Sequence, residues 1–131
     1  GCLLVKIQES AENYLEAILM IQKQKGSCRS IDVAQFLSFS KPSVSRAMSL
    51  LRENGYVIMD DNGLLSLTDA GREIAERMLE RHELLTEWLT RLGVHPDTAQ
   101  ADACRIEHVI SSETFDQIKA HIARHDAPSQ D

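Results

Sequence analysis

Three side chains that bind transition metals lie close together in the segment Cys104-Arg105-Ile106-Glu107-His108. On a helix, the spacing i, i+3 and i+4 places a thiol, a carboxylate and an imidazole on one face, within about one turn. A thiolate and an imidazole together favour iron, cobalt or zinc over magnesium or calcium. The spacing therefore predicts a site for a divalent transition metal at Cys104, Glu107 and His108.

Three ligands from one helix leave a metal ion undercoordinated, so other helices must supply further ligands. The candidates are His82, on the apolar stripe of a neighbouring predicted helix, and Glu16, on the first predicted helix. Plainer interpretations stay open at this point. Cys104 alone fits a small buried apolar residue, a Glu-His pair fits a solvated helix face, and His82 fits a hydrogen-bonded interface residue.

The other cysteines and histidines carry less information. Cys2, Cys28 and Cys104 are too few, and odd in number, for a disulfide framework, so each is interpreted alone. His121 and His125, at i and i+4, have the spacing of metal ligands, but their place near the chain end favours simple exposure. A nucleophilic cysteine with a histidine base would need an oxyanion hole, and no Gly-rich loop accompanies it, so we expect no enzyme.

The elements that must position these residues form a mainly α-helical pattern with one small β-hairpin. Apolar spacing predicts helices over residues 9–23, 31–37 and 42–53, with Ser10 as the cap of the first. Two β-rich runs, 56–59 and 64–67, flank Asn62-Gly63, which is a strong hairpin signal. Helix, turn, helix and hairpin is the order of a winged helix-turn-helix, in which the second helix enters the major groove of DNA.

The predicted recognition helix has a polar face suited to DNA. A guanidinium at Arg46 can bind guanine O6 and N7 together, which makes this residue the expected base reader. Lys41, Ser43 and Ser45 are expected to hold phosphates. The full set of candidate DNA-binding residues is Arg46, Ser43, Ser45, Lys41, Pro42 and Ser49.

The net charge of −6 hides a basic segment. Residues 22–52 contain six Lys or Arg residues against Asp32 alone, and the remainder of the chain is acidic. A basic segment beside an acidic one is typical of a nucleic-acid-binding domain joined to a body with another role. The hairpin tip carries Asp60 and Asp61, so we expect it to contribute little to phosphate binding.

Three further helices are predicted after the hairpin, over residues 68–92, over 97–110 and from 112 onward. Their apolar stripes can pack against one another and against a second copy of the chain. The expected architecture is an N-terminal winged helix-turn-helix followed by a helical dimerisation and metal-binding domain. The predicted boundaries are 1–70 for the DNA-binding domain, 71–125 for the dimerisation domain and 126–131 for a flexible tail.

Over about residues 9–123 the sequence resembles a known family. The winged helix is followed by Arg81-His82-Glu83-Leu84-Leu85 and then by Ala103-Cys104-Arg105-Ile106-Glu107-His108-Val109. This order resembles the metal-dependent repressors of the diphtheria toxin repressor and manganese transport regulator type, in a short form without the SH3-like domain. The resemblance implies a homodimer in which a divalent metal acts as corepressor and joins the first helix to the dimerisation helices.

The resemblance also implies a set of metal ligands. Their positions are Glu16, Cys104, Glu107, His108, His82 and Asn13. Cys104 matches the iron branch, whereas Asn13 stands where the manganese branch has an acidic residue. Thr86 and Gln100 stand where the iron branch has two ligands of an ancillary site. The thiol favours Fe(II), with Mn(II) as the alternative, and Zn(II), Co(II) or Ni(II) are expected to bind in vitro.

The implied function is a repressor of iron or manganese homeostasis genes that binds palindromic double-stranded operator DNA. No apolar run approaches the ~20 residues of a membrane span, so we expect a cytoplasmic protein without a membrane partner. A winged-helix regulator that senses a small organic ligand is the alternative. It predicts that no stoichiometric metal binds.

Overall fold

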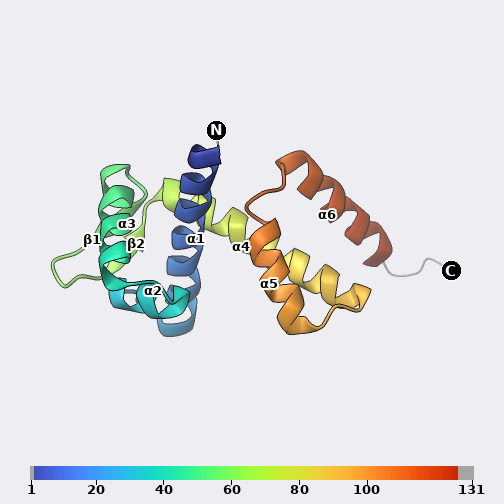
Figure 1. Cartoon of the computed structure of the whole chain (residues 1–131), viewed down its shortest axis with the longest axis horizontal. Coiled ribbons are helices and arrows are strands. Elements are labelled where there is room, and N and C mark those ends of the chain that lie inside the picture. Colours follow the sequence, from blue (N-terminus) through green and yellow to red (C-terminus); the bar gives the residue numbers. More distant parts are fainter. Residues whose placement is uncertain (1, 127–131) are drawn as a thin grey trace. The chain divides into compact units, whose positions relative to one another are not determined.

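The computed structural model describes residues 2–126, with side chains described for residues 10–125. The helices and strands follow one another as α1 (Cys2–Lys25), α2 (Ser30–Leu37), α3 (Lys41–Glu53), β1 (Val57–Met59), β2 (Leu65–Leu67), α4 (Asp69–Leu92), α5 (Pro96–Ile106) and α6 (Ser112–Asp126) (Figure 1). Two compact units divide this chain inside α4, one ending at Leu79 and the other beginning at Glu80. The mainly helical fold with one hairpin is as predicted.

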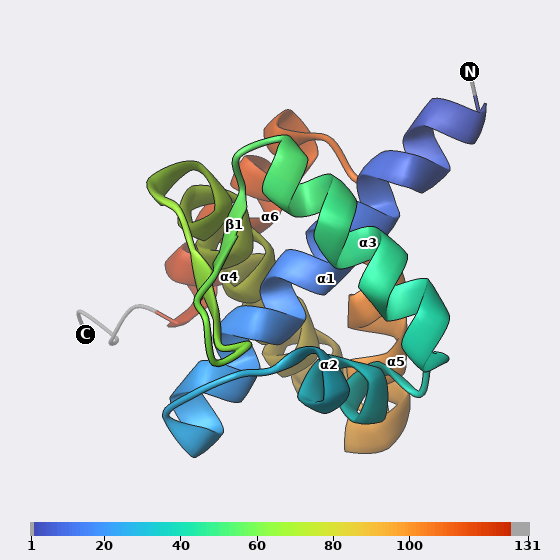
Figure 2. The same cartoon turned by 90° about the vertical axis from the view of Figure 1, so that its left-hand side faces the viewer.

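The N-terminal unit is built around α1, which packs against α2, α3 and β2 (Figure 2). Leu15 and Ile18 of α1 are fully buried in a core that also includes Val33, Val44 and Met48. The helix begins well before the predicted residue 9. Ser10 therefore lies inside α1, and the prediction that it caps the helix is wrong.

The turn between α2 and α3 sets the direction of the predicted recognition helix. Ser38 adopts a left-handed conformation, with φ of 58°, and ends α2. Ser40 is the N-cap of α3, since its hydroxyl accepts a hydrogen bond from the Ser43 backbone N–H. Pro42 lies in the first turn of α3, where a missing N–H breaks no helical hydrogen bond. This arrangement buries one face of α3 and leaves the other in solvent.

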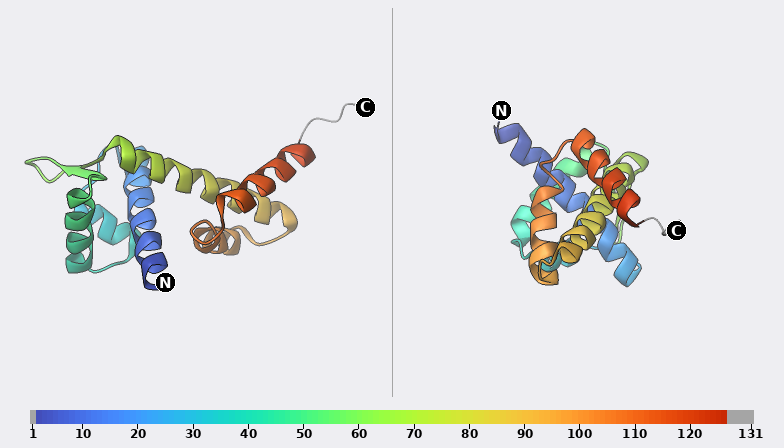
Figure 3. Two further views of the ribbon diagram at one scale, coloured as in Figure 1. Left: turned by 90° about the horizontal axis from the view of Figure 1, so that it is seen from above. Right: turned by 90° about the vertical axis from the view of Figure 1, so that its right-hand side faces the viewer.

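The hairpin forms at the predicted place with shorter strands. β1 and β2 pair antiparallel, with Val57 opposite Leu67, and the hairpin extends beyond the helices of its own unit (Figure 3). The Asp60 carboxylate accepts the backbone N–H groups of Asn62 and Leu64 at 2.8 and 2.9 Å. Gly63 completes the turn with φ of 81°, a conformation that favours glycine. An isolated bridge between Arg29 and Leu64 ties the tip to the start of α2.

The C-terminal unit has a small core of its own. Leu85 of α4, Ala103 of α5 and Phe115 of α6 are buried together, with Trp88 and other apolar residues packed around them. α5 ends at Ile106 rather than at the predicted residue 110, so Glu107 and His108 lie just beyond the helix. Leu92, the last residue of α4, is 65% exposed. Among the described helices, none combines the length and apolar character needed to cross a membrane.

Candidate metal centre and nucleic-acid interface

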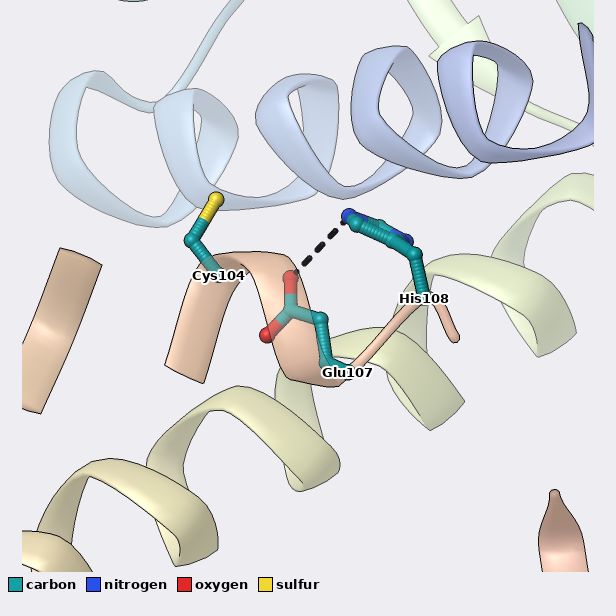
Figure 4. A group of neighbouring side chains, drawn as sticks. All are labelled: Cys104, Glu107 and His108. Carbon is teal, nitrogen blue, oxygen red and sulfur yellow. Dashed lines mark ion pairs between the residues drawn. The ribbon is translucent and has the colours of Figure 1, made fainter. Parts of the chain in front are cut away.

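The structure brings Cys104, Glu107 and His108 together (Figure 4). One potential ligand atom from each side chain lies within 4.8 Å of those from the other two. The predicted helical spacing holds only in part, because Glu107 caps α5 and His108 lies in the following turn. The Glu107 backbone N–H nevertheless donates to the Ala103 carbonyl at 2.9 Å, which continues the helical path by one residue. The three groups therefore stay on one side of the α5 terminus.

Glu107 is the centre of this cluster. Its side chain is fully buried, and its two carboxylate oxygens face different histidines. Oε2 lies 3.0 Å from Nδ1 of His82, and Oε1 lies 3.3 Å from Nε2 of His108. The His82 ring N–H can donate to this carboxylate, which offsets the cost of burying a negative charge. His82, predicted from α4, is thus joined to the cluster through Glu107.

Arg81, next to His82 on α4, fixes the backbone that carries Glu107. Its Nη1 donates to the carbonyl oxygens of Glu107 and Ile110 at 3.0 and 3.1 Å, and its Nη2 donates to the Ser112 hydroxyl at 3.1 Å. The guanidinium also lies over the Phe115 ring, 5.3 Å from the centroid. A buried cation thereby satisfies carbonyls at the end of α5 and links α4 to the start of α6.

Sequence reasoning assigned no role to Arg81. The only available signal was its position directly before a candidate ligand, within the Arg81-His82-Glu83-Leu84-Leu85 segment. Amphipathic spacing could not reveal the contact, because the acceptors are backbone carbonyls 26 and 29 residues further along the chain. Such contacts depend on tertiary packing and not on side-chain types.

The remaining predicted metal ligands lie on α1. Glu16 is buried and Asn13 is half-buried. Thr86 follows His82 by one turn of α4 and is half-buried, and Gln100 is exposed on α5. Around Glu107, the C-terminal unit by itself therefore brings together one thiol, one carboxylate and two imidazoles. This donor set fits a divalent transition ion, because thiolate and imidazole groups bind transition ions in preference to magnesium or calcium.

The candidate DNA-binding residues lie on the solvent face of α3. Lys41, Pro42, Ser45, Arg46 and Ser49 are exposed, whereas Val44, Met48 and Leu51 face the core. Ser43 is half-buried and receives a hydrogen bond from the Ser40 hydroxyl at 2.8 Å. Its hydroxyl therefore already takes part in the cap of α3.

Part of the basic charge of residues 22–52 is compensated within the fold. Lys25 forms an ion pair with Asp32 at 3.1 Å. The Arg29 guanidinium donates to the carbonyl of Asn62, at the hairpin tip. The Arg29 backbone N–H, followed by the Lys25 ammonium, holds the pKa of the Asp32 carboxyl below its usual range. Lys41, Arg46 and Arg52 remain as exposed cations on α3 itself.

Cys28 has no place in the metal centre. It is fully buried in the N-terminal core, and burial raises the pKa of its thiol to about 12. A thiol of such high pKa stays protonated at neutral pH, and the thiolate is the form that binds metals. For Cys28 the core interpretation therefore holds. Cys2 lies at the start of α1, outside the described side chains.

Comparisons with known proteins cover both units. Residues 6–64 match the iron dependent repressor N-terminal DNA binding domain, and residues 68–127 match the iron dependent repressor metal binding and dimerisation domain. The chain is 35% identical over 109 residues to the HTH-type transcriptional regulator MntR of Geobacillus kaustophilus, covering 83% of this chain and 77% of that protein. It is 32% identical over 120 residues to the transcriptional regulator MntR of Escherichia coli O6:H1, covering 92% and 77%.

Solved structures show the same fold. A manganese-dependent transcriptional repressor in complex with manganese has 30% identity and a TM-score of 0.77, covering 86% of this chain and 52% of that one. IdeR of T. acidophilum has 24% identity and a TM-score of 0.76, covering 86% and 53%. The chain thus spans about half the length of these two structures. Together the two domain matches and the two relatives show that this chain belongs to the iron-dependent repressor family of metal-dependent, DNA-binding transcriptional regulators.

Proposed function

We propose that the chain is a transcriptional repressor whose corepressor is a divalent metal ion bound by Cys104, Glu107 and His108. The observation that supports this most directly is the grouping of the three ligand atoms within 4.8 Å of one another. When bound, such an ion supplies a positive charge that the three donors share. The protein's own groups must be deprotonated to bind it, so Nε2 of His108, which lies 3.3 Å from Glu107 Oε1, must carry no proton when it is a ligand.

His82 is the first additional ligand in this proposal. Its Nδ1 lies 3.0 Å from Glu107 Oε2, so the imidazole orients the carboxylate. Arg81 holds the backbone of the same glutamate and is a positioning residue. Partners that orient a ligand in this way typically change metal affinity by about 10–100-fold when they are removed.

Glu16 and Asn13 of α1 complete the proposed ligand set. Their assignment rests on the sequence resemblance. Asn13 would offer a carbonyl oxygen in place of a carboxylate, which lowers the negative charge of the set. Ligands on α1 would make metal binding favour one conformation of the helix that supports α2 and α3. Metal would then act by shifting the population of DNA-binding conformations, without touching DNA.

The proposed physiological ion is Fe(II), with Mn(II) as the alternative. The thiol of Cys104 supports Fe(II), since sulfur donors bind Mn(II) weakly. Mn(II) is supported by the relative of known structure that holds manganese. Zn(II), Co(II) or Ni(II) are expected to bind in vitro, because they stand higher than Mn(II) in the usual affinity order.

For DNA, the proposal assigns base reading to Arg46 on the exposed face of α3. Lys41, Ser45 and Ser49 are exposed beside it, and Pro42 and Ser43 belong to the first turn. A homodimer presents two such helices, so its operator is a palindrome with half-sites about one helical turn (~34 Å) apart. The proposed targets are iron or manganese homeostasis genes, and the protein would act in the cytoplasm, where those genes lie.

The test is an anaerobic titration of the full chain with Fe(II), Mn(II) and Zn(II), followed by calorimetry and competition with a chelator. We expect about one or two ions per chain and at least roughly tenfold weaker binding in Cys104→Ala. Cys28→Ala makes the same chemical change in the N-terminal core and serves as the matched control. Its metal affinity should equal that of the wild type.

Absence of stoichiometric metal binding would overturn the proposal and favour the organic-ligand alternative. The N-terminal unit contains a largely apolar hollow of about 700 Å³ whose lining includes Tyr14, Leu15, Leu51, Tyr56 and Ile74. Its volume falls within the range of about 300–1,000 Å³ that is usual for small-molecule sites. A regulator of that kind would bind an organic effector and leave metal affinity at background.

A further inference from the structure

Two histidines on α6 lie outside the metal centre described above. His121 and His125 are both exposed, and their ring centroids are 4.3 Å apart with the ring planes inclined at 59°. They are four residues apart on one helix, Ser112–Asp126, so both side chains leave the same face. The approach of the two rings is a direct consequence of this spacing.

Two imidazoles at i and i+4 can share one metal ion. The same spacing supplies two zinc ligands in helical H-E-x-x-H sites, and zinc–nitrogen distances are about 2.0–2.1 Å. Within the described residues, clusters of three or more His, Cys, Asp or Glu side chains with adjacent ligand atoms include neither histidine. An ion at this position would therefore have two protein ligands and would keep its other positions open to solvent.

We propose that His121 and His125 form a second, solvent-open site for Cu(II), Ni(II) or Zn(II). The affinity order of first-row divalent ions rises from Mn(II) and Fe(II) to Cu(II), so two exposed imidazoles select the later ions. The site shares no ligand with the Cys104 cluster and does not rest on the proposed repressor function. As a consequence, the number of ions bound per chain depends on the metal, and is larger with Zn(II) than with Mn(II).

The hollow beside His121 provides an internal reporter. Trp88 of α4 lines it together with Glu113, Gln117 and Ile118 of α6. Trp88 is the only tryptophan in the sequence. A paramagnetic ion held by His121 is therefore expected to quench the whole tryptophan signal of the protein, whereas an ion at a remote exposed histidine is not.

The test uses Cu(II) held by nitrilotriacetate, added to the untagged full chain. This chelate leaves few coordination positions, which suits two exposed imidazoles. The Cys104 cluster is excluded from the measurement, because it needs three donors and its Glu107 is fully buried. We expect an electron paramagnetic resonance spectrum with two coordinated imidazole nitrogens and quenching of Trp88 fluorescence. Removing one of two linked ligands, as in His121→Gln or His125→Gln, should weaken binding roughly 10²-fold.

Two controls test whether the affinity depends on the i, i+4 pairing or only on the number of exposed histidines. His95→Gln removes another exposed histidine, whose side chain is 72% accessible, and should leave the affinity unchanged. A double variant, His125→Gln with Ala123→His, keeps two histidines on α6 but places them two residues apart, so it should bind as weakly as His121→Gln. Circular dichroism verifies that each variant is folded. Wild-type affinity in His121→Gln or in the double variant, or an equal loss in His95→Gln, would overturn the proposal.

Discussion

We expect the thiol of Cys104 to set the metal preference of the proposed centre. Replacing it by a carboxylate, in Cys104→Asp, exchanges a soft sulfur donor for a hard oxygen donor within the same cluster. Oxygen donors suit Mn(II), whereas thiolates suit Zn(II) and iron. We expect the ratio of Zn(II) to Mn(II) affinity to fall by at least about tenfold, which corresponds to roughly 1.4 kcal/mol.

Competition between the two ions, measured anaerobically in one titration, reports this ratio without a need for absolute affinities. Cys28→Ser is the comparison, because Cys28 lies in the other unit and its thiol is buried. That variant can lose stability, but its Zn(II) to Mn(II) ratio should remain that of the wild type. An unchanged ratio in Cys104→Asp would show that the side chain at position 104 does not contact the ion.

At the scale of single residues, the sequence identifies the candidate ligands better than the residues that hold those ligands in place. Cys104, Glu107 and His108 could be predicted because their ligand chemistry and spacing are visible in the chain. Arg81 could not, since its partners are backbone carbonyls brought near by the turn after α5. The hydrogen bond of His82 to Glu107 likewise depends on how α4 packs beside the end of α5. Both the Arg81 contacts and the His82 contact arise from tertiary packing.

Among the elements, the start of α4 is held against the hairpin by an unusually close backbone approach. A Cβ atom at Gly71 would lie 2.1 Å from the Tyr56 carbonyl oxygen. In an ordinary helix interior, Gly→Ala stabilises by about 1 kcal/mol. Here the clash must displace backbone, so we expect Gly71→Ala to lower the free energy of unfolding by about 1–3 kcal/mol. Urea denaturation of the two proteins measures the difference.

Ala70→Gly is the matched control for this prediction, because Ala70 is the exposed neighbour in the same turn of α4. Its effect is limited to helix propensity, about 1 kcal/mol or less. The sign of the change in unfolding free energy in Gly71→Ala tests whether α4 approaches the Tyr56 carbonyl this closely. A gain in stability would mean that α4 does not approach Tyr56 as closely as the structure shows.

The carboxylate of Asp32 at the N-terminus of α2 makes a pH-dependent contribution to stability. The Asp32 carboxylate accepts the Arg29 backbone N–H at 2.9 Å and the Lys25 ammonium at 3.1 Å, and these contacts lower its pKa. A carboxyl whose folded-state pKa is lowered stabilises the fold above its unfolded-state pKa, about 3.9, and loses this contribution as pH falls. Asp32→Asn should therefore destabilise at pH 7, by less than about 1 kcal/mol.

Denaturation at several pH values between 7 and 3 tests this expectation. The difference between wild type and Asp32→Asn should shrink as pH falls through the folded-state pKa of Asp32. Asp61→Asn, at the exposed hairpin tip, provides a control whose stability should follow the wild type at every pH. A difference that stays constant down to pH 3 would assign the effect to packing and not to charge.

Element types could be predicted further than element ends. The periodicity of apolar residues gave α2, α3, α4 and α6 to within a few residues, and Asn62-Gly63 gave the hairpin. The start of α1 was missed because Ser10 is a good cap residue that here lies inside a longer helix. The end of α5 was predicted four residues too late; in the structure the Glu107 and Ile110 carbonyls beyond it accept hydrogen bonds from Arg81 of α4, a tertiary contact that apolar spacing does not reveal.

For the whole molecule, the division into two units raises the question of which unit responds to metal. The Cys104 cluster and His82 lie in the C-terminal unit, whereas Glu16 and Asn13 lie on α1 of the N-terminal unit. A ligand that binds only the folded state stabilises it by about 2.7 kcal/mol at a concentration of 100 Kd. If both units supply ligands, metal binding must stabilise the folded state of both units.

Hydrogen exchange of backbone amides can follow each unit separately with and without Mn(II). We expect slower exchange in the segment around Cys104 and His108 and also in α1 around Glu16, because both would be ordered by the shared ion. Glu16→Gln should abolish the response of α1 while Glu73→Gln, an exposed glutamate of α4, leaves it intact. Slower exchange confined to residues 80–126 would remove Glu16 and Asn13 from the ligand set. The regulator would then need another route from its metal to α3, since nothing else in the proposal couples the ion to the DNA-binding unit.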